Sequence, residues 1–331
     1  MNLMYNNTIT MNNMHFDEVY TMKKVFIDGG AGTTGLRIVE RLSSRNDIEI
    51  IKLEESVRKD YKARKQALNS CDAAFLCLPD EAAVLAADMV ENKDVILFDT
   101  STAHRTQPGW AYGFPELGST FFENIKTSKR IAVPGCHASG FIALVYPLIK
   151  NKIVSENANL TCHSITGYSG GGKKMIAQYE DENADALLGA PRQYAITQSH
   201  KHLKEMSYIT GLETAPVFCP IVAPFYSGMV VTVPLFKSDL KDGFSVDSIK
   251  EIYKNTYNTG IVSYVSGSFE DGFISAAGLS GKDSMQIAVC GNEDRILLIA
   301  RYDNLGKGAS GAAIECMNIA FGLDPALGLD I

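Results

Sequence analysis

The sequence predicts an α/β protein in which a doubly wound parallel-sheet domain is combined with an α+β domain that has a largely antiparallel sheet. Two observations predict this fold. Up to about residue 150 of the 331-residue chain, short apolar runs alternate with helical patterns, which indicates parallel strands joined by crossover helices. Beyond that point longer β-rich segments dominate and helical patterns are few, as in an α+β domain.

Each element of the first part is predicted from its own apolar pattern. The predicted strands span residues 23–29, 48–53, 71–80, 94–101 and 129–135. Helical patterns follow at 33–44, 81–92 and 138–150. The first helix is expected to place Leu36, Val39 and Leu42 near one face, and the last has the apolar stripe of a core-facing helix.

The second part is predicted to be mainly β-structure. Its strand candidates span residues 158–167, 216–225, 228–236, 261–267, 285–291 and 295–303. The clearest helix lies at 245–258. Residues 308–323 are expected to close the chain as an amphipathic helix, with Ile314, Met317 and Phe321 at helical spacing, and to pack back on the first domain.

The composition excludes several classes of protein. The formal net charge is -7, whereas binding to nucleic-acid phosphates needs a surplus of Lys and Arg. No apolar run approaches the roughly 20 residues of a membrane-spanning helix, and the first residues lack the pattern of a signal peptide. We therefore expect a cytoplasmic protein that binds no nucleic acid and no membrane and acts on a small molecule.

The cysteines indicate free thiols. Their number is odd, their spacing is wide and no CxxC pair occurs, which is typical of a reducing cytoplasm and of neither a disulfide framework nor a metal site. Six of them lie in or beside apolar strand-like runs or within the last helix, and we expect these in the core: Cys71, Cys77, Cys162, Cys219, Cys290 and Cys316.

A glycine-rich turn follows the first predicted strand. It contains Gly30-x-Gly32-x-x-Gly35 and opens the helix that begins near Thr33. In this strand–turn–helix context the spacing predicts a Rossmann-type dinucleotide site, because the glycines let a pyrophosphate approach backbone N–H groups at the positive end of the helix. We expect Thr33 and Thr34 to contribute to the same site. An ordinary glycine-rich turn is the alternative.

The charged segment after the second strand bears on the choice between NAD and NADP. An acid there binds a ribose hydroxyl, whereas Arg or Lys accepts a 2′-phosphate. The segment offers both Glu54 and Glu55 and a basic cluster formed by Arg58, Lys59, Lys62 and Arg64. The basic cluster favours NADP, with Arg58 as the expected contact; a solvated charged loop is the alternative.

Cys136 lies at a strand–helix junction, in "VPGCHASG". The positive end of a helix stabilises a thiolate, so this position suits a nucleophile. A small buried hydrophobe is the alternative, and the residues alone do not decide between the two. A thiolate beside a nicotinamide would form a thioester from an acyl donor, and hydride would reduce that thioester to an aldehyde.

The ordered motifs "GGAGTTG", "DTSTAHR", "VPGCHASG", "SGGGKK" and "HKHLKEM" together resemble the N-acetyl-gamma-glutamyl-phosphate reductases, in their shorter form. The related aspartate-semialdehyde dehydrogenases typically follow the catalytic Cys with Asn, whereas His137 stands here. The resemblance implies NADPH-dependent reduction of N-acetyl-L-glutamyl 5-phosphate to the semialdehyde, in arginine biosynthesis. It also implies an inserted α+β domain that supplies the subunit interface, hence a homo-oligomer, a dimer or a tetramer.

The resemblance assigns roles to several residues. Cys136 becomes the nucleophile, and His200 or His202 a general acid/base, with His200 favoured. Glu205 would orient a histidine or bind substrate. Gly308 and Gly311 would lie in a loop that touches the nicotinamide side.

Two further segments are candidates for binding substrate. Arg105 follows a strand end, where an α/β sheet places its ligands, and its guanidinium suits a phosphate or carboxylate, with Ser101 assisting. An Arg that caps a surface turn is the alternative. Lys173 and Lys174 end a glycine-rich loop that could close over substrate, with Lys174 as the expected contact; a plain mobile loop is the alternative.

These expectations divide the chain into four regions. Residues 1–21 are interpreted as a flexible extension or an over-long gene start, with Met22 as the alternative first residue. An NADP-binding domain is expected at 22–135, an α+β domain for catalysis, substrate and oligomerisation at 136–303, and a returning C-terminal helix at 304–331. Two other functions stay open: the same chemistry on aspartyl phosphate or a carrier-linked acyl phosphate, and a non-enzymatic NADP-binding regulator.

Overall fold

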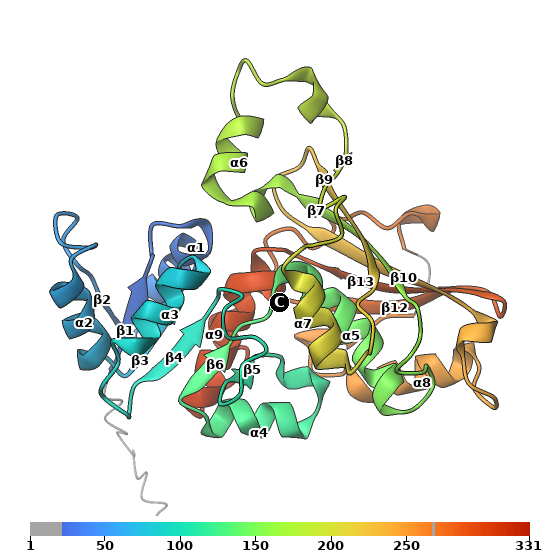
Figure 1. Ribbon diagram of the computed structural model, residues 1–331, viewed down its shortest axis with the longest axis horizontal. Coiled ribbons are helices and arrows are strands. Elements are labelled where there is room, and N and C mark those ends of the chain that lie inside the picture. Colours follow the sequence, from blue (N-terminus) through green and yellow to red (C-terminus); the bar gives the residue numbers. More distant parts are fainter. Residues whose placement is uncertain (1–21, 267–268) are drawn as a thin grey trace, which may run out of the picture.

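Two β-sheets lie side by side in the computed structural model, which describes residues 22–266 and 269–331 (Figure 1). The interpretation of residues 1–21, and the end of the strand predicted at 261–267, lie outside the described residues. The predicted combination of a doubly wound parallel sheet with a second, largely antiparallel sheet is confirmed. No helix in the described ranges combines the length and the apolar character needed to cross a membrane.

The first sheet is parallel throughout and has the strand order β2-β1-β3-β4-β6-β5. Its strands are β1 (Lys23–Asp28), β2 (Ile48–Ile51), β3 (Ala73–Leu76), β4 (Ile96–Asp99), β5 (Ala111–Tyr112) and β6 (Arg130–Ala132). Its helices are α1 (Thr33–Ser43), α2 (Tyr61–Ser70), α3 (Asp80–Asp88) and α4 (Ser119–Thr127). Strands β3 and β4 are buried at every residue, which explains their continuous apolar runs.

The buried face of α1 differs from the predicted one. Gly35, Ile38 and Leu42 point into the core, whereas Leu36 is 48% exposed and Val39 is half-buried. Leu42 and Ile38 are four residues apart and continue the row that begins at Gly35, so the glycine itself occupies the core-facing position of the first turn.

The second sheet has the order β11-β12-β13-β10-β7-β9-β8 and is mixed rather than purely antiparallel. The pairs β7/β9 and β11/β12 are parallel, and the other four pairs are antiparallel. Its strands are β7 (Thr161–Gly167), β8 (Arg192–Gln193), β9 (Val217–Ala223), β10 (Met229–Phe236), β11 (Val262–Tyr264), β12 (Met285–Gly291) and β13 (Arg295–Tyr302).

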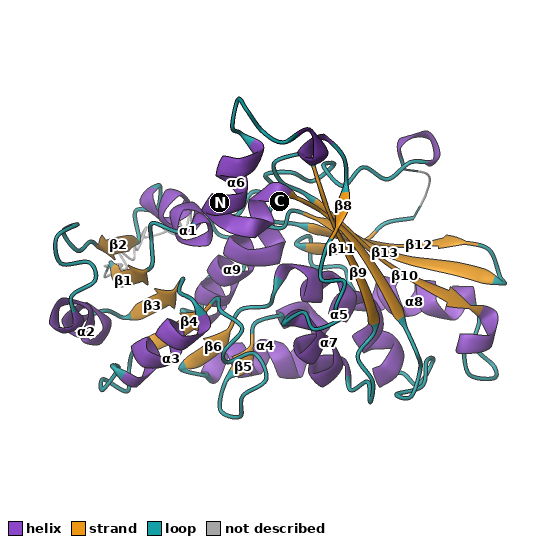
Figure 2. Ribbon diagram, turned by 45° about the horizontal axis from the view of Figure 1, so that its top comes forward, coloured by secondary structure: helices purple, strands orange, loops and turns teal. Residues whose placement is uncertain are grey.

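One face of this sheet is covered by helices, as Figure 2 shows. These are α5 (Cys136–Lys150), α7 (His202–Thr210) and α8 (Val246–Thr256). Alternate residues of β10, such as Met229, Val231 and Val233, are buried against them. The short helix α6 (Gly172–Tyr179) stands apart from both sheets, at the top of Figure 1.

The last helix, α9 (Gly311–Ala320), is not amphipathic as predicted. Every residue from Gly311 to Ile319 is buried, and Phe321 lies beyond the helix end. Its apolar side chains pack with those of β1, β3 and β4 in one core cluster, so the chain does return to the first domain as expected. The helix lies between the two sheets in Figure 1 and is buried on all sides for that reason.

Candidate active site

A cavity of about 640 Å³ opens where the two parts of the chain meet. The segments that follow β1, β3, β4 and β6 line one side, because parallel strands bring their carboxyl ends to the same edge of a sheet. The other side comes from the end of β7, from residues 194–202 and from the turn at residues 304–309. Of the predicted site residues, the cavity is lined by Gly32, Thr33, Thr34, Gly35, Ser101, Arg105, Cys136, His200, His202 and Gly308.

Cys136 is the first residue of α5, with Gly135 as the N-cap. The positive end of the helix therefore faces the thiol as expected, and the His137 backbone N–H and the Arg105 guanidinium both favour the thiolate. Burial outweighs them and raises the pKa of Cys136 to about 11. With a pKa this high the thiol holds its proton at neutral pH, so its attack on an acyl donor would need a proton acceptor.

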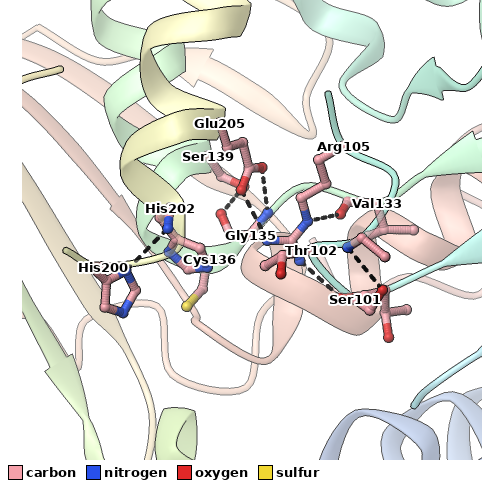
Figure 3. Close-up of polar contacts among 12 residues, drawn as sticks. Ser101, Thr102, Arg105, Val133, Gly135, Cys136, Ser139, His200, His202 and Glu205 are labelled. Carbon is pink, nitrogen blue, oxygen red and sulfur yellow. Dashed lines mark hydrogen bonds and ion pairs between the residues drawn. The ribbon is translucent and has the colours of Figure 1, made fainter. Parts of the chain in front are cut away.

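Glu205 lies behind the cavity wall rather than in it. Its carboxylate accepts hydrogen bonds from Arg105 Nη1 at 2.9 Å, from the Tyr112 hydroxyl at 2.8 Å and from the Gly135 N–H at 2.8 Å (Figure 3). It is 2% exposed and is absent from the cavity lining. The structure thus gives Glu205 three internal partners, none of them a histidine, and one of them is the residue before Cys136.

Arg105 is tied to the protein through three of its five N–H groups. Nε donates to the Val133 carbonyl at 2.8 Å and Nη2 to the Thr100 carbonyl at 2.9 Å, in addition to the Glu205 ion pair. These bonds join the ends of β4 and β6 to α7. The guanidinium still lines the cavity, and its remaining two N–H groups have no partner among the described residues, so they can bind a ligand.

Ser101 faces the cavity, but its hydroxyl donates a hydrogen bond to Asp99 Oδ2 at 2.8 Å. The same carboxylate holds His104 Nδ1 at 2.6 Å. The Ser101 side chain is thus oriented by the buried end of β4 and can offer a ligand only its oxygen lone pair.

Three histidines gather around Cys136. His200 and His202 have ring centroids 4.8 Å apart, and His137 lies 5.9 Å and 5.6 Å from them. Burial lowers the pKa of both His200 and His202, so both rings are neutral at pH 7. His200 is half-buried and faces the cavity, whereas His202 is buried and its Nδ1 has no hydrogen-bond partner in the described part of the chain.

Figure 3 shows the Cys136 sulfur pointing toward the side on which the His200 ring lies, away from Glu205 and Arg105. His200 Nδ1 accepts the backbone N–H of His202 at 3.2 Å. A neutral imidazole that accepts at Nδ1 carries its proton on Nε2, which can then be donated to a ligand oxygen. The resting site therefore presents a neutral donor at His200 and an unpaired ring nitrogen at His202.

The glycine turn has the geometry of a phosphate cradle. Gly29 has a φ of +86°, and a Cβ added at Gly35 would lie 2.6 Å from the Gly29 carbonyl oxygen, so both positions require glycine. Helix α1 begins at Thr33 with no side-chain cap and no acid in its first turn, and the buried Thr33 Oγ1 has no partner among the described residues. Unpaired donors at a helix N-terminus fit the phosphates of a dinucleotide.

A second cavity of about 450 Å³ continues from this turn along β2. Gly30 lines it rather than the first cavity, together with Arg58, Lys59 and Arg64. Arg64 is paired with Asp28 at 2.8 Å, whereas Arg58 is paired with the exposed Glu55 at 2.6 Å. Arg64 lies on α2, which sequence patterning missed because only Ala67 and Leu68 of that helix are buried.

Lys174 does not line either cavity, and both Lys173 and Lys174 are exposed on α6. The preceding glycines, residues 170–172, do line the first cavity. Sequence reasoning missed Tyr194, Lys201, Asn304 and Cys77, which also line it. Lys201 stands inside the quoted motif "HKHLKEM", which was the available signal for it.

The turn at Gly306–Ser310 packs a glycine against Cys136. A Cβ added at Gly308 would lie 3.2 Å from the Cys136 Cβ. The neighbouring Lys307 points the other way, into a buried ion pair with Glu116 at 2.7 Å and a second one with Glu315. No group of three or more potential ligand residues in the described ranges could hold a metal ion.

Family models and individual relatives match both parts of this chain. The family model described as "Semialdehyde dehydrogenase, NAD binding domain" matches residues 24–125, and "Semialdehyde dehydrogenase, dimerisation domain" matches residues 136–304. An N-acetyl-gamma-glutamyl-phosphate reductase of Sinorhizobium medicae is 43% identical over 303 residues, covering 89% of this chain and 98% of the relative. An N-acetyl-gamma-glutamyl-phosphate reductase of Trichormus variabilis is 42% identical over 319 residues, covering 92% of this chain and 99% of the relative.

Among solved structures, aspartate semialdehyde dehydrogenase II from Vibrio cholerae has a TM-score of 0.69 at 16% identity, covering 91% of this chain and 98% of that one. Aspartate semialdehyde dehydrogenase with NADP from Candida albicans has a TM-score of 0.62 at 14% identity, covering 90% of this chain and 98% of that one. These structures share the fold. The identity to the curated relatives over most of the chain shows that this protein belongs to the N-acetyl-gamma-glutamyl-phosphate reductase family of enzymes, which carries a nicotinamide-dinucleotide-binding domain.

Proposed function

We propose that this protein catalyses the NADPH-dependent reduction of N-acetyl-L-glutamyl 5-phosphate to N-acetyl-L-glutamate 5-semialdehyde and phosphate, in arginine biosynthesis. One observation carries the proposal: the Cys136 thiol, the phosphate-cradling turn at Gly32–Gly35 and the His200 imidazole line one cavity. That combination suits an acyl group transferred to sulfur and then reduced. The relatives' names supply the acyl phosphate.

Cys136 acts as the nucleophile. Its proton passes to a neutral imidazole, and its sulfur attacks the acyl carbon, so that the S–C bond forms and the bond to phosphate breaks. The product of this step is a thioester on Cys136. When bound, the dinucleotide supplies the hydride that reduces the thioester. Gly308, pressed against the cysteine, leaves room for a flat group beside the sulfur.

His200 exchanges protons with the reacting oxygen. It faces the cavity, and its Nε2 proton can be donated to the oxyanion that forms when the sulfur or the hydride adds. The buried His202 lines the same cavity as the thiol and is the proposed acceptor of its proton. Collapse of the reduced adduct then releases the aldehyde and returns a proton to the Cys136 sulfur.

The substrate phosphate is placed by cations on the cofactor side. The two free N–H groups of Arg105 and the ammonium of Lys201 line the same cavity as the thiol. An Arg held by three internal bonds binds an oxyanion without losing much side-chain entropy. Lys174, exposed on α6, has no part in this arrangement.

NADP is proposed as the cofactor in preference to NAD. The chain after β2 places no acid directly at the strand end, where Lys52 and Leu53 stand, and Arg58 and Lys59 line the second cavity. Arg58→Ala is expected to raise KM for NADPH about tenfold and to leave KM for NADH nearly unchanged, because only the former carries a 2′-phosphate. Equal effects on both cofactors would contradict this assignment.

A second copy of this chain is the proposed partner. The face of the second sheet opposite α5 carries apolar side chains, and part of it is covered by Phe269 and Ile274. Beyond that cover, Val217, Phe236 and Leu297 are exposed, Phe236 at 63%. The matching family model is described as a dimerisation domain. Phe236→Asp is expected to shift the sedimentation coefficient toward the monomer, whereas an unchanged coefficient would place the interface elsewhere.

The test of the whole proposal is an assay with N-acetylglutamyl phosphate and NADPH, or with the semialdehyde, phosphate and NADP⁺ in reverse. Cys136→Ser should abolish turnover while dinucleotide binding, followed by fluorescence titration, survives. Full activity in that variant would refute the mechanism. Aspartyl phosphate run in parallel distinguishes the main alternative, since preference for it would replace the proposed substrate.

A further inference from the structure

We propose that Tyr194 orients the substrate by donating its hydroxyl proton to the amide carbonyl of an N-acylated amino acid, with His137 and Ser164 setting the direction of that hydrogen bond. The inference rests on the function proposed above. It names the group that separates an N-acylated substrate from one with a free amine.

The three residues form a chain of hydrogen bonds that ends in the cavity. Ser164 on β7 lies 2.7 Å from His137 Nδ1, measured from its Oγ, and the Tyr194 hydroxyl lies 2.6 Å from His137 Nε2. Ser164 and His137 are buried, whereas Tyr194 lines the cavity. The Tyr194 backbone N–H donates to the Pro220 carbonyl at 3.0 Å, which anchors this segment beside β9.

The number of protons that the three side chains carry determines which group donates in each of these hydrogen bonds. In the part of the chain that the structure describes, the Ser164 hydroxyl has one side-chain partner, His137 Nδ1, and a buried hydroxyl proton needs an acceptor. Burial lowers the pKa of His137 to about 3, so the ring is neutral and holds one proton. With Nδ1 accepting, that proton is on Nε2 and is donated to the Tyr194 oxygen. The Tyr194 proton is thereby left for the cavity.

This arrangement suits an amide carbonyl and opposes an ammonium group. The phenol keeps its proton, since burial raises the pKa of Tyr194 well above its usual value. A carbonyl oxygen accepts such a proton, whereas an ammonium group needs an acceptor or a counter-ion. Among the described residues that line the cavity, the one carboxylate is Asp80, and its two oxygens already accept the Thr102 N–H and hydroxyl on the cofactor side.

The experiment compares two aldehydes that differ only in the acylated amine. The reverse reaction, with phosphate and NADP⁺, is run with N-acetyl-L-glutamate 5-semialdehyde and with 5-oxopentanoate, which lacks the acetamido group. Tyr194→Phe is expected to lower kcat/KM for the N-acetylated aldehyde about 10- to 100-fold, the worth of one buried hydrogen bond, and to change it less than about threefold for 5-oxopentanoate. Tyr208→Phe, at an exposed tyrosine on α7, is the matched control and should match the wild type on both.

The outcomes separate this inference from the function beneath it. If the wild type turns over neither aldehyde, the proposed function falls and the inference with it. If the wild type is active and Tyr194→Phe loses the same factor on both aldehydes, the function stands and the inference is overturned, because the hydroxyl then acts at the reacting end. An unchanged variant overturns it as well.

The proton direction has its own readout. Nitrogen NMR of the wild-type protein, with the His137 signals assigned by comparison with His137→Gln, should show a neutral ring protonated at Nε2. Protonation at Nδ1 would mean that Tyr194 donates to His137 and offers the substrate only an acceptor. That result would overturn the assigned preference for an amide carbonyl.

Discussion

The substitution Glu205→Ala is expected to destabilise the fold far more than it weakens substrate binding. The Glu205 carboxylate is 2% exposed and accepts three hydrogen bonds, from Arg105, Tyr112 and the Gly135 amide. None of these partners is a ligand. The structure therefore predicts a loss of folding free energy, whereas the family resemblance implied that Glu205 orients a histidine or binds substrate.

The magnitude follows from the groups that the substitution leaves behind. Removing one partner of a buried ion pair costs about 3–5 kcal/mol, since Arg105, itself buried, keeps its charge. The Tyr112 hydroxyl and the Gly135 amide each lose an acceptor, at about 1 kcal/mol apiece when partly rehydrated. We expect the free energy of unfolding to fall by about 5 kcal/mol in Glu205→Ala. Glu205→Gln keeps the shape but not the charge, and should lose about 2–3 kcal/mol.

Urea unfolding followed by tryptophan fluorescence is the assay. The chain has one tryptophan, Trp110, which stacks on the ring of His104 at a centroid distance of 3.9 Å, one residue from Arg105. Protein concentration is held constant, because self-association would shift the midpoint. Glu123→Ala, at an exposed glutamate on α4, is the matched control and should change stability by less than about 0.5 kcal/mol.

The result that would refute this reasoning is a variant of near wild-type stability with a raised KM. If Glu205→Ala lost less than about 1 kcal/mol while KM for the semialdehyde rose tenfold or more, Glu205 would be a substrate ligand. A stable variant with unchanged KM would also contradict the reasoning, since the buried Arg105 guanidinium would then lack its counter-ion without any loss in the free energy of unfolding.

Three further predictions rest on other parts of the site. Alkylation of Cys136, taken as the difference from Cys136→Ser, should be slow at pH 8 and rise about tenfold per pH unit toward pH 11, because burial raises its pKa to about 11; a plateau by pH 9 would contradict this. Lys307→Met leaves two buried glutamates without their cation and should lower the free energy of unfolding by about 3–5 kcal/mol. Lys241→Met, at an exposed lysine, is the control and should change it little, so equal stability of the two variants would disprove the ion-pair argument. Gly35→Ala places a Cβ 2.6 Å from the Gly29 carbonyl oxygen and should raise the Kd for NADPH about tenfold by fluorescence titration, so an unchanged Kd would show that the turn relaxes freely.

The fold was predictable where burial is continuous or strictly alternating. β3 and β4 are buried at every residue and are almost wholly apolar, and β10 buries every second residue from Val231 to Leu235, so each carries its own pattern. The elements that were missed lack such a pattern. Helix α2 buries only Ala67 and Leu68, and the two-residue β5 is too short for any period. α9 was placed correctly but taken as amphipathic, because its polar Glu315 is buried by the ion pair with Lys307.

The location of the site was also predictable, because strand ends converge by topology. The glycine turn at Gly32–Gly35, Arg105 and Cys136 each follow a strand of the parallel sheet, and all three line the cavity. The roles of the side chains were harder, since they depend on partners far away in the chain. Arg105 and Glu205 are 100 residues apart, and nothing local to either indicates that they form an ion pair. The exposure of Lys174 and the position of Tyr194 in the cavity likewise follow from how the long segment between β7 and β9 folds, most of which lies outside the sheets.

Cys136 shows why the charge state of a side chain is harder to infer from local sequence than its position in the fold. The influences that favour the thiolate are nearby and visible in the sequence: a helix N-terminus and the N–H of the next residue. Burial acts against them and raises the pKa of Cys136, and burial depends on how the whole chain folds around the thiol. The site then requires a neutral base, and the same burial that protonates the thiol keeps His200 and His202 neutral. One physical cause, burial, therefore accounts for both the protonated thiol and the neutral imidazoles beside it.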